Sequence, residues 1–157
     1  MKSSYDIALE IANREDEEKD GERILELLDK GVEDADGRAA CARAICYVDG
    51  KFGSNINEAK ATELFLKLSD SKIPEALFAL AVSFDKGDGV AQDQSVAFEY
   101  NLKAATLGHS ESCFQVSEFF REGSIVLESK SLQSFWLKRS QEKESVISPA
   151  DRVWLRV

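Results

Sequence analysis

The 157-residue sequence predicts an all-α fold, an α-solenoid of about 3.5 to 4 helical hairpins with a short C-terminal capping helix. Three observations predict it. A helix–loop–helix pattern recurs every 36 or 37 residues, a glycine closes the first helix of each copy, and the chain has only two prolines. The recurring positions are Ala39, Ala76 and Ser112; Tyr47, Phe84 and Phe120; Gly50, Gly87 and Gly123; Leu64, Tyr100 and Trp136; and Lys67, Lys103 and Arg139. Repeats of this length bury their apolar faces against their neighbours.

We expect a single repeat domain over residues 1–157, because a chain of this length suits one continuous core. Leu27 lies 37 residues before Leu64, so the N-terminal segment is interpreted as a degenerate hairpin in the same register. Ser148 and Pro149 resemble the start of a helix and predict a short C-terminal cap. The expected boundaries are 1–36 for the N-terminal hairpin, 37–73, 74–109 and 110–144 for three repeats, and 145–157 for the cap.

The middle repeat shows each element most clearly. Ala76, Leu80 and Phe84 are spaced by four residues, which predicts one face of a helix. Gly87 ends that helix because glycine accepts the left-handed conformation of a helix C-terminus, and Asp93 caps the second helix. The third repeat follows the same pattern. The first has one extra residue between its glycine and Leu64, which a loop absorbs.

Composition and charge exclude several classes of protein. No apolar run approaches the length of a membrane span and no secretory signal is present, so we expect a cytoplasmic protein that binds no membrane. The three cysteines, Cys41, Cys46 and Cys113, are expected to be reduced and buried. The net charge of −9 is concentrated in residues 1–37, which carry 13 acidic and five basic residues. This argues against nucleic acid and permits a basic protein partner.

The middle repeat resembles the Sel-one-like repeat, a relative of the tetratricopeptide repeat. The residues that carry this resemblance are Ala76, Leu80, Ala81, Phe84, the run Gly87-Asp88-Gly89-Val90, Asp93, Ala97, Tyr100, Lys103, Ala104, Ala105 and Gly108. Ala81 and Tyr100 replace the usual glycine and tryptophan, and Arg43 in the first repeat replaces the usual leucine. The resemblance implies a right-handed superhelix of helix pairs that acts as a non-enzymatic adaptor or scaffold for protein partners.

In solenoids of this type the concave wall is formed mainly by the first helix of each pair. We expect the partner to contact the residues of these helices that turn away from the second helix, here called the A-face residues. They are Arg38, Cys41, Ile45, Asp49, Glu75, Phe78, Val82, Asp85, Lys86, Glu111, Phe114, Glu118, Arg121 and Glu122. Cys41, Phe78 and Phe114 share one register position and predict an apolar stripe. Phe78 and Phe114 are alternatively core residues between adjacent helices.

Other candidate sites have little support in the sequence. His109 is the only histidine, lies at a predicted turn and has no partner at metal-ligand spacing. An acidic patch of Glu15, Asp16, Glu17, Glu18 and Asp20 lacks the spacing of a calcium loop and is either a solvated loop or part of a binding surface. The sequence predicts no catalytic residue, metal site or cofactor.

The preferred hypothesis is therefore a protein-interaction module, a monomer or weak homodimer, that binds a protein through its concave groove and acidic N-terminal hairpin. Its small size and acidity suggest a bacterial immunity or inhibitor protein that neutralises a toxin or enzyme domain. A regulatory adaptor is the first alternative. A hydrolase that uses carboxylates in the groove is the second.

Overall fold

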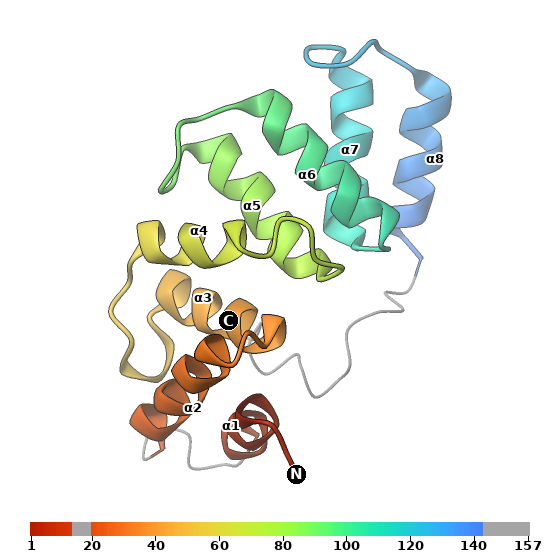
Figure 1. Cartoon of the computed structure of the whole chain (residues 1–157). Coiled ribbons are helices and arrows are strands. Elements are labelled where there is room, and N and C mark those ends of the chain that lie inside the picture. The colour runs from red at the N-terminus through yellow and green to blue at the C-terminus, as the bar shows by residue number, and fades with distance from the viewer. Residues whose placement is uncertain (14–19, 143–157) are drawn as a thin grey trace. The chain divides into compact units, whose positions relative to one another are not determined.

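The computed structural model describes residues 1–13 and 20–142, whose regular elements are all helices (Figure 1). The described residues form two compact units, which divide between Leu68 and Ser69. Within each unit every helix packs against the next one in the chain. The expectation of an all-α solenoid is confirmed, whereas the C-terminal cap at 145–157 lies outside the described residues.

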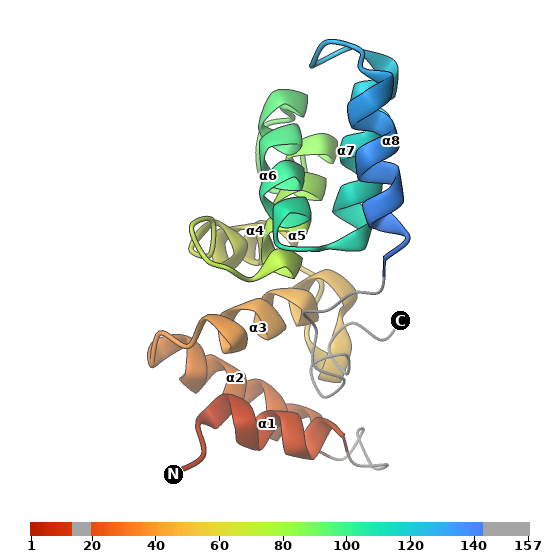
Figure 2. The same ribbon diagram turned by 90° about the vertical axis from the view of Figure 1, so that its right-hand side faces the viewer.

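The first unit contains four α-helices and one short 3₁₀ helix. Their bounds are Ser4–Ala12 (α1), Gly21–Glu33 (α2), Gly37–Asp49 (α3), Lys51–Gly53 (η2) and Glu58–Leu66 (α4). Tyr5, Ala8, Ile24, Leu28 and Ala39 belong to a buried cluster that joins α1, α2 and α3. Figure 2 shows α1, α2 and α3 in succession in this unit.

The second unit contains four α-helices. Their bounds are Pro74–Lys86 (α5), Gln94–Thr106 (α6), Ser110–Glu122 (α7) and Lys130–Ser140 (α8). The pairs α5–α6 and α7–α8 run side by side in both views (Figures 1 and 2). Ala105, Cys113, Val116 and Trp136 form a buried cluster between α6, α7 and α8.

The helix bounds follow the repeat read from the sequence. The helices α3, α5 and α7 each span 13 residues and begin at positions 37, 74 and 110. Each ends at a left-handed glycine, with φ of 67° at Gly50, 85° at Gly87 and 67° at Gly123. Because a side chain strains this conformation, the three glycines fix where the first helix of each repeat stops.

The starts of the second helices are also set by local chemistry. Asn57, Asp93 and Ser129 recur every 36 residues, and each side chain accepts a hydrogen bond from a backbone N–H in the first turn of α4, α6 or α8. The structure confirms Asp93 as a cap. It also shows that His109, expected in a turn, is the N-cap residue of α7.

The extra residue of the first repeat lies in the loop after α3. The chain there forms η2, and Phe52 within it has a φ of 56° and packs against the core of the first unit. Cys41, Cys46 and Cys113 are free and buried, as expected. Among the described residues, no helix is long and apolar enough to span a membrane.

Candidate functional site

The A-face residues of the second unit lie on α5 and α7. Asp85, Lys86, Glu111, Arg121 and Glu122 are exposed, whereas Glu75, Val82 and Glu118 are half-buried. Phe78 is also half-buried, and its ring lies 4.7 Å from the imidazole of His109. Nδ1 of His109 accepts a hydrogen bond from the backbone N–H of Ser112 at 3.2 Å. The cap of α7 therefore holds the ring that covers Phe78.

Phe114 is the apolar centre of the outward face of α7. Its side chain is 40% exposed, and Glu118 and Arg121 follow on the same helical face. Nε and Nη2 of Arg121 donate to the Glu118 carboxylate at 2.7–3.1 Å, and these hydrogen bonds lower the pKa of Glu118. The face thus combines one exposed aromatic ring with fixed charges of both signs.

The A-face residues of the first unit have mixed environments. Arg38 is exposed, forms ion pairs with Asp6 and Asp36 at 3.2 and 3.0 Å, and lies over the ring of Tyr5. Asp49 is exposed, Ile45 is half-buried and Cys41 is buried. Because Cys41 and the two phenylalanines belong to different units, the stripe that joins them remains a prediction.

Most of the acidic patch lies outside the described residues. Glu15, Asp16, Glu17 and Glu18 fall in the segment between α1 and α2 for which the structure gives no description. Asp20 is half-buried and precedes the first residue of α2. Its role in binding is therefore untested.

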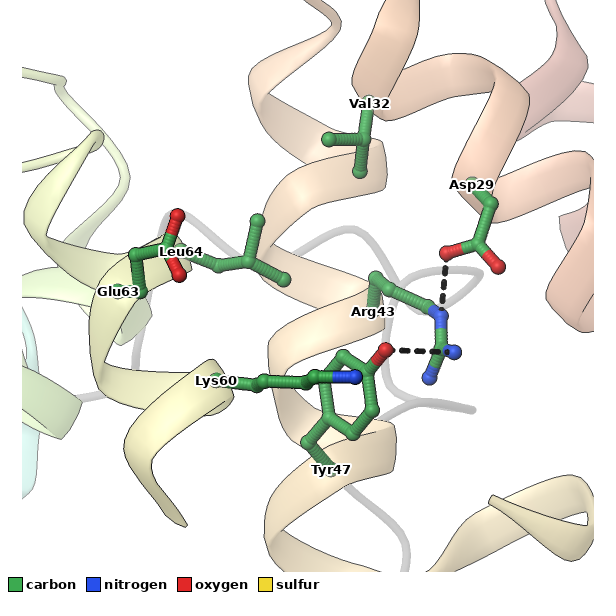
Figure 3. Close-up of a pocket in the computed structure, with 7 residues that line it drawn as sticks. All are labelled: Asp29, Val32, Arg43, Tyr47, Lys60, Glu63 and Leu64. Carbon is green, nitrogen blue, oxygen red and sulfur yellow. Dashed lines mark hydrogen bonds and ion pairs between the residues drawn. The ribbon is translucent and has the colours of Figure 1, made fainter. Parts of the chain in front are cut away.

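The first unit also contains a cleft that our sequence analysis did not predict. Its volume is about 170 Å³, comparable to cavities that accept a benzene-sized molecule. Three helices line it, with Asp29 and Val32 on α2, Arg43 and Tyr47 on α3, and Lys60, Glu63 and Leu64 on α4. Figure 3 shows Val32, Leu64, Arg43, Tyr47 and Lys60 around a common space. None of these seven is an A-face residue.

Arg43 forms the polar wall of the cleft and is only 7% exposed. Its Nε donates to Oδ1 of Asp29 at 2.6 Å, Nη1 donates to the Ser54 hydroxyl at 3.0 Å, and Nη2 donates to the Tyr47 hydroxyl at 3.0 Å. The guanidinium carbon also lies 3.9 Å from the centroid of the Tyr47 ring. These contacts fix both Arg43 and the phenol in one geometry.

Lys60 approaches the cleft from the first turn of α4. Its ammonium lies 5.6 Å from the centroid of the Tyr47 ring, at cation–π distance. Within the described part of the chain, no carboxylate pairs with it, whereas the neighbouring Glu63 is paired with Lys67 at 3.1 Å. Lys60 therefore brings an unneutralised positive charge to the rim.

The repeat register contains a signal that identifies this cleft. Asp29, Arg43 and Lys60 correspond to Leu66, Leu80 and Val96 one repeat later, and to Leu102, Val116 and Leu132 in the next. The counterparts of Arg43 are apolar and buried, whereas those of Asp29 and Lys60 are half-buried or exposed and the last counterpart of Asp29 is Lys138. Of these positions only Arg43 departs from the repeat pattern in the sequence, where leucine is usual.

Together, the helical hairpins, their 36- or 37-residue step and their glycine-terminated first helices define an α-solenoid repeat protein. Residues 37–72 and 74–109 match the family model of the Sel1 repeat. The chain therefore carries two Sel1 repeats, which confirms the resemblance read from its residues. Repeats of this class typically mediate protein–protein interaction.

Solved structures with the same fold support this assignment. A Sel1 repeat protein from Oxalobacter formigenes matches with a TM-score of 0.69 and 21% identity over 75% of this chain and 48% of that chain. A protective antigen present in uropathogenic Escherichia coli strains, which displays an SLR fold, matches with a TM-score of 0.78 and 22% identity over 87% of this chain and 29% of that chain. This chain thus spans less than half of either relative. No curated protein matches it.

Proposed function

We propose that this chain is a non-enzymatic module that binds a protein partner through its A-face residues, with the acidic patch as a second contact. The observation that carries the proposal is the outward face of α7, where an exposed Phe114 lies among the charges of Glu118 and Arg121. Exposed aromatic rings within a polar rim are typical of residues that dominate binding energy at protein interfaces. The class of repeat supports the same function.

A finer version of the proposal concerns the partner. The excess of acidic residues before position 38 would accelerate encounter with a basic protein and make the association rate sensitive to salt. An immunity or inhibitor protein that neutralises a toxin or enzyme domain, acting as a monomer or weak homodimer in the cytoplasm, fits these properties. A regulatory adaptor would use the same surface on a partner whose activity it does not block.

The test is affinity capture from the native cell with the whole chain as bait, followed by mass spectrometry. Phe114→Ala should lose a protein that the unsubstituted chain retains. Phe135→Ala is the matched control, because Phe135 is an exposed phenylalanine of α8 outside the A-face residues. Circular dichroism should show both variants folded.

The outcomes separate the hypotheses. Retention of no protein, or equal retention by the two variants, would contradict binding through this face. If a protein is captured specifically, inhibition of its activity by the added chain favours the immunity version. An uninhibited partner favours the adaptor.

A further inference from the structure

The cleft between α2, α3 and α4 differs from the corresponding place in the next two repeats at the position of Arg43. Asp29, Arg43 and Lys60 converge on it, and Arg43 lies where the next two copies have Leu80 and Val116. The apolar alternative packs well, since Leu80 and Val116 are completely buried in their own repeats. At this one position the first repeat therefore has a charged, hydrogen-bonded side chain where the next two copies have a buried apolar one.

Stability accounts for Arg43 in part, because its hydrogen bonds and its ion pair with the half-exposed Asp29 hold this place together. It does not account for Lys60, which forms no ion pair with a described carboxylate. Lys60 is also locally unfavourable, because a cation in the first turn of a helix opposes the helix dipole. A lysine that costs stability and extends over a cleft points to recognition of a ligand.

The donors available in the cleft define the chemistry of that ligand. Lys60 has no carboxylate partner in the described part of the chain, and the hydroxyl of Tyr47, which accepts from Arg43, still has its own proton to donate. Figure 3 shows the Lys60 side chain extended across the Tyr47 ring toward Arg43. An anionic group at this point would receive hydrogen bonds from the ammonium and the phenol.

The opposite wall is apolar. Val32 and Leu64 face the same space, and the Tyr47 ring closes it. The volume of about 170 Å³ suits one side chain rather than an extended peptide. A glutamate side chain has both required parts, a short aliphatic stem and a terminal carboxylate.

We propose that this cleft binds a glutamate side chain of the protein partner, with the carboxylate on Lys60 and Tyr47 and the stem against Val32 and Leu64. The proposal deepens the function proposed above, since it assigns an acidic anchor residue to the partner. Arg43 acts as a positioning residue that orients the phenol and whose charge is balanced by Asp29. The Lys60 ammonium also gives specificity, because a partner with a basic residue at this position would be repelled.

The test is a titration of the isotopically labelled whole chain with a short capped peptide, acetyl-Gly-Leu-Glu-Gly-amide, followed by NMR of the backbone amides. We expect shifts at amides of α3 and α4 that border the cleft. The peptide with glutamine in place of glutamate should bind at least tenfold more weakly. Lys60→Met should abolish the preference for glutamate, whereas Lys30→Met, an equal change of charge on α2 outside the cleft, should leave it intact.

Equal affinity for the two peptides, shifts confined to other helices, or an unchanged preference in Lys60→Met would each overturn the proposal. Tyr47→Phe provides an independent check, because it removes the proposed donor and retains the ring. The unsubstituted and variant proteins should have matching spectra outside the cleft, which shows that the variants fold. Failure here leaves partner capture through Phe114 untouched, so the two proposals can fail separately.

Discussion

Replacement of Arg43 by leucine tests whether the charged cleft is required for folding. Leucine is the residue at the corresponding position of the next repeat, where Leu80 is completely buried. The substitution removes the hydrogen bonds to Asp29, Ser54 and Tyr47 and the contact with the Tyr47 ring. We expect the free energy of unfolding of Arg43→Leu to stay within about 1 kcal/mol of the unsubstituted value.

The magnitude follows from the exposure of the groups that remain. The Asp29 side chain is 54% exposed, so its carboxylate regains water and its lost ion pair costs about 1 kcal/mol. The two hydroxyls and the lost cation–π contact add about 2 kcal/mol. Burial of the leucine side chain returns about 1.5–3 kcal/mol. Arg43→Ala lacks this return and should be destabilised by about 2–4 kcal/mol.

Replacement of the other partner of the ion pair, Asp29, should change the free energy of unfolding by a different amount. Asp29→Asn leaves the guanidinium of Arg43 buried without its counter-charge, which should cost about 2–3 kcal/mol even though Asp29 is the more exposed partner. Urea unfolding followed by circular dichroism measures all three variants, provided that the slope m is unchanged. If Arg43→Leu is destabilised as much as Arg43→Ala, the polar network holds the fold and the argument for recognition fails.

Two further predictions follow from close contacts and burial. A Cβ added at Gly31 of α2 would lie 2.5 Å from Cβ of Ala39 on α3, so Gly31→Ala should destabilise the fold by about 1–3 kcal/mol although alanine has the better helix propensity. The double variant Gly31→Ala/Ala39→Gly removes this clash. If urea unfolding shows that the effects of the two single substitutions simply add in the double variant, the clash is not the cause. Burial raises the pKa of the Cys46 thiol to about 11, so at pH 8 a thiol reagent should label it about two orders of magnitude more slowly than the unfolded chain. Because the fold favours the neutral thiol, its contribution to the free energy of unfolding should be complete below about pH 9 and disappear as the pH rises toward 11. In Cys46→Ala the free energy of unfolding should fall less over this pH range. Rapid labelling of Cys46, or an equal fall in both proteins, would show that the thiol is accessible.

Local chemistry made the helices predictable from the sequence. The glycines Gly50, Gly87 and Gly123 and the recurring caps act within one turn of a helix, so their effects can be read from neighbouring residues. The sequence predicts a turn at His109, whereas in the structure its imidazole caps α7, a role more common for Ser, Thr, Asp or Asn. In α8 the side chain of Phe135 is 51% exposed and that of Trp136 only 9%. Both residues are aromatic, so this difference in exposure follows from packing and not from residue type.

The cleft was missed for a different reason. Its residues come from α2, α3 and α4, and the spacing within one helix does not indicate that Asp29 and Lys60 approach Arg43. A comparison between copies at fixed register isolates Arg43, and only the packing of the three helices brings Asp29 and Lys60 to it. For the A-face residues the sequence identifies which side chains share a face but not how exposed each one is. The exposure of Phe78 and Phe114 depends on the neighbouring helices.

Repetition of the hairpin explains how such a cleft can arise. Each copy in a solenoid is stabilised by its own core and its nearest neighbours, so a loss of apolar packing in one copy has mainly local consequences. Here the cluster of Ile24, Leu28 and Ala39 still joins α2 to α3 beside the charged positions, and the glycine and N-cap that bound the first repeat remain. One copy can therefore have Arg43 in place of a buried apolar side chain while the next two copies keep Leu80 and Val116. A repeat with a buried leucine in place of Arg43 would retain the fold and lack the polar wall of this cleft.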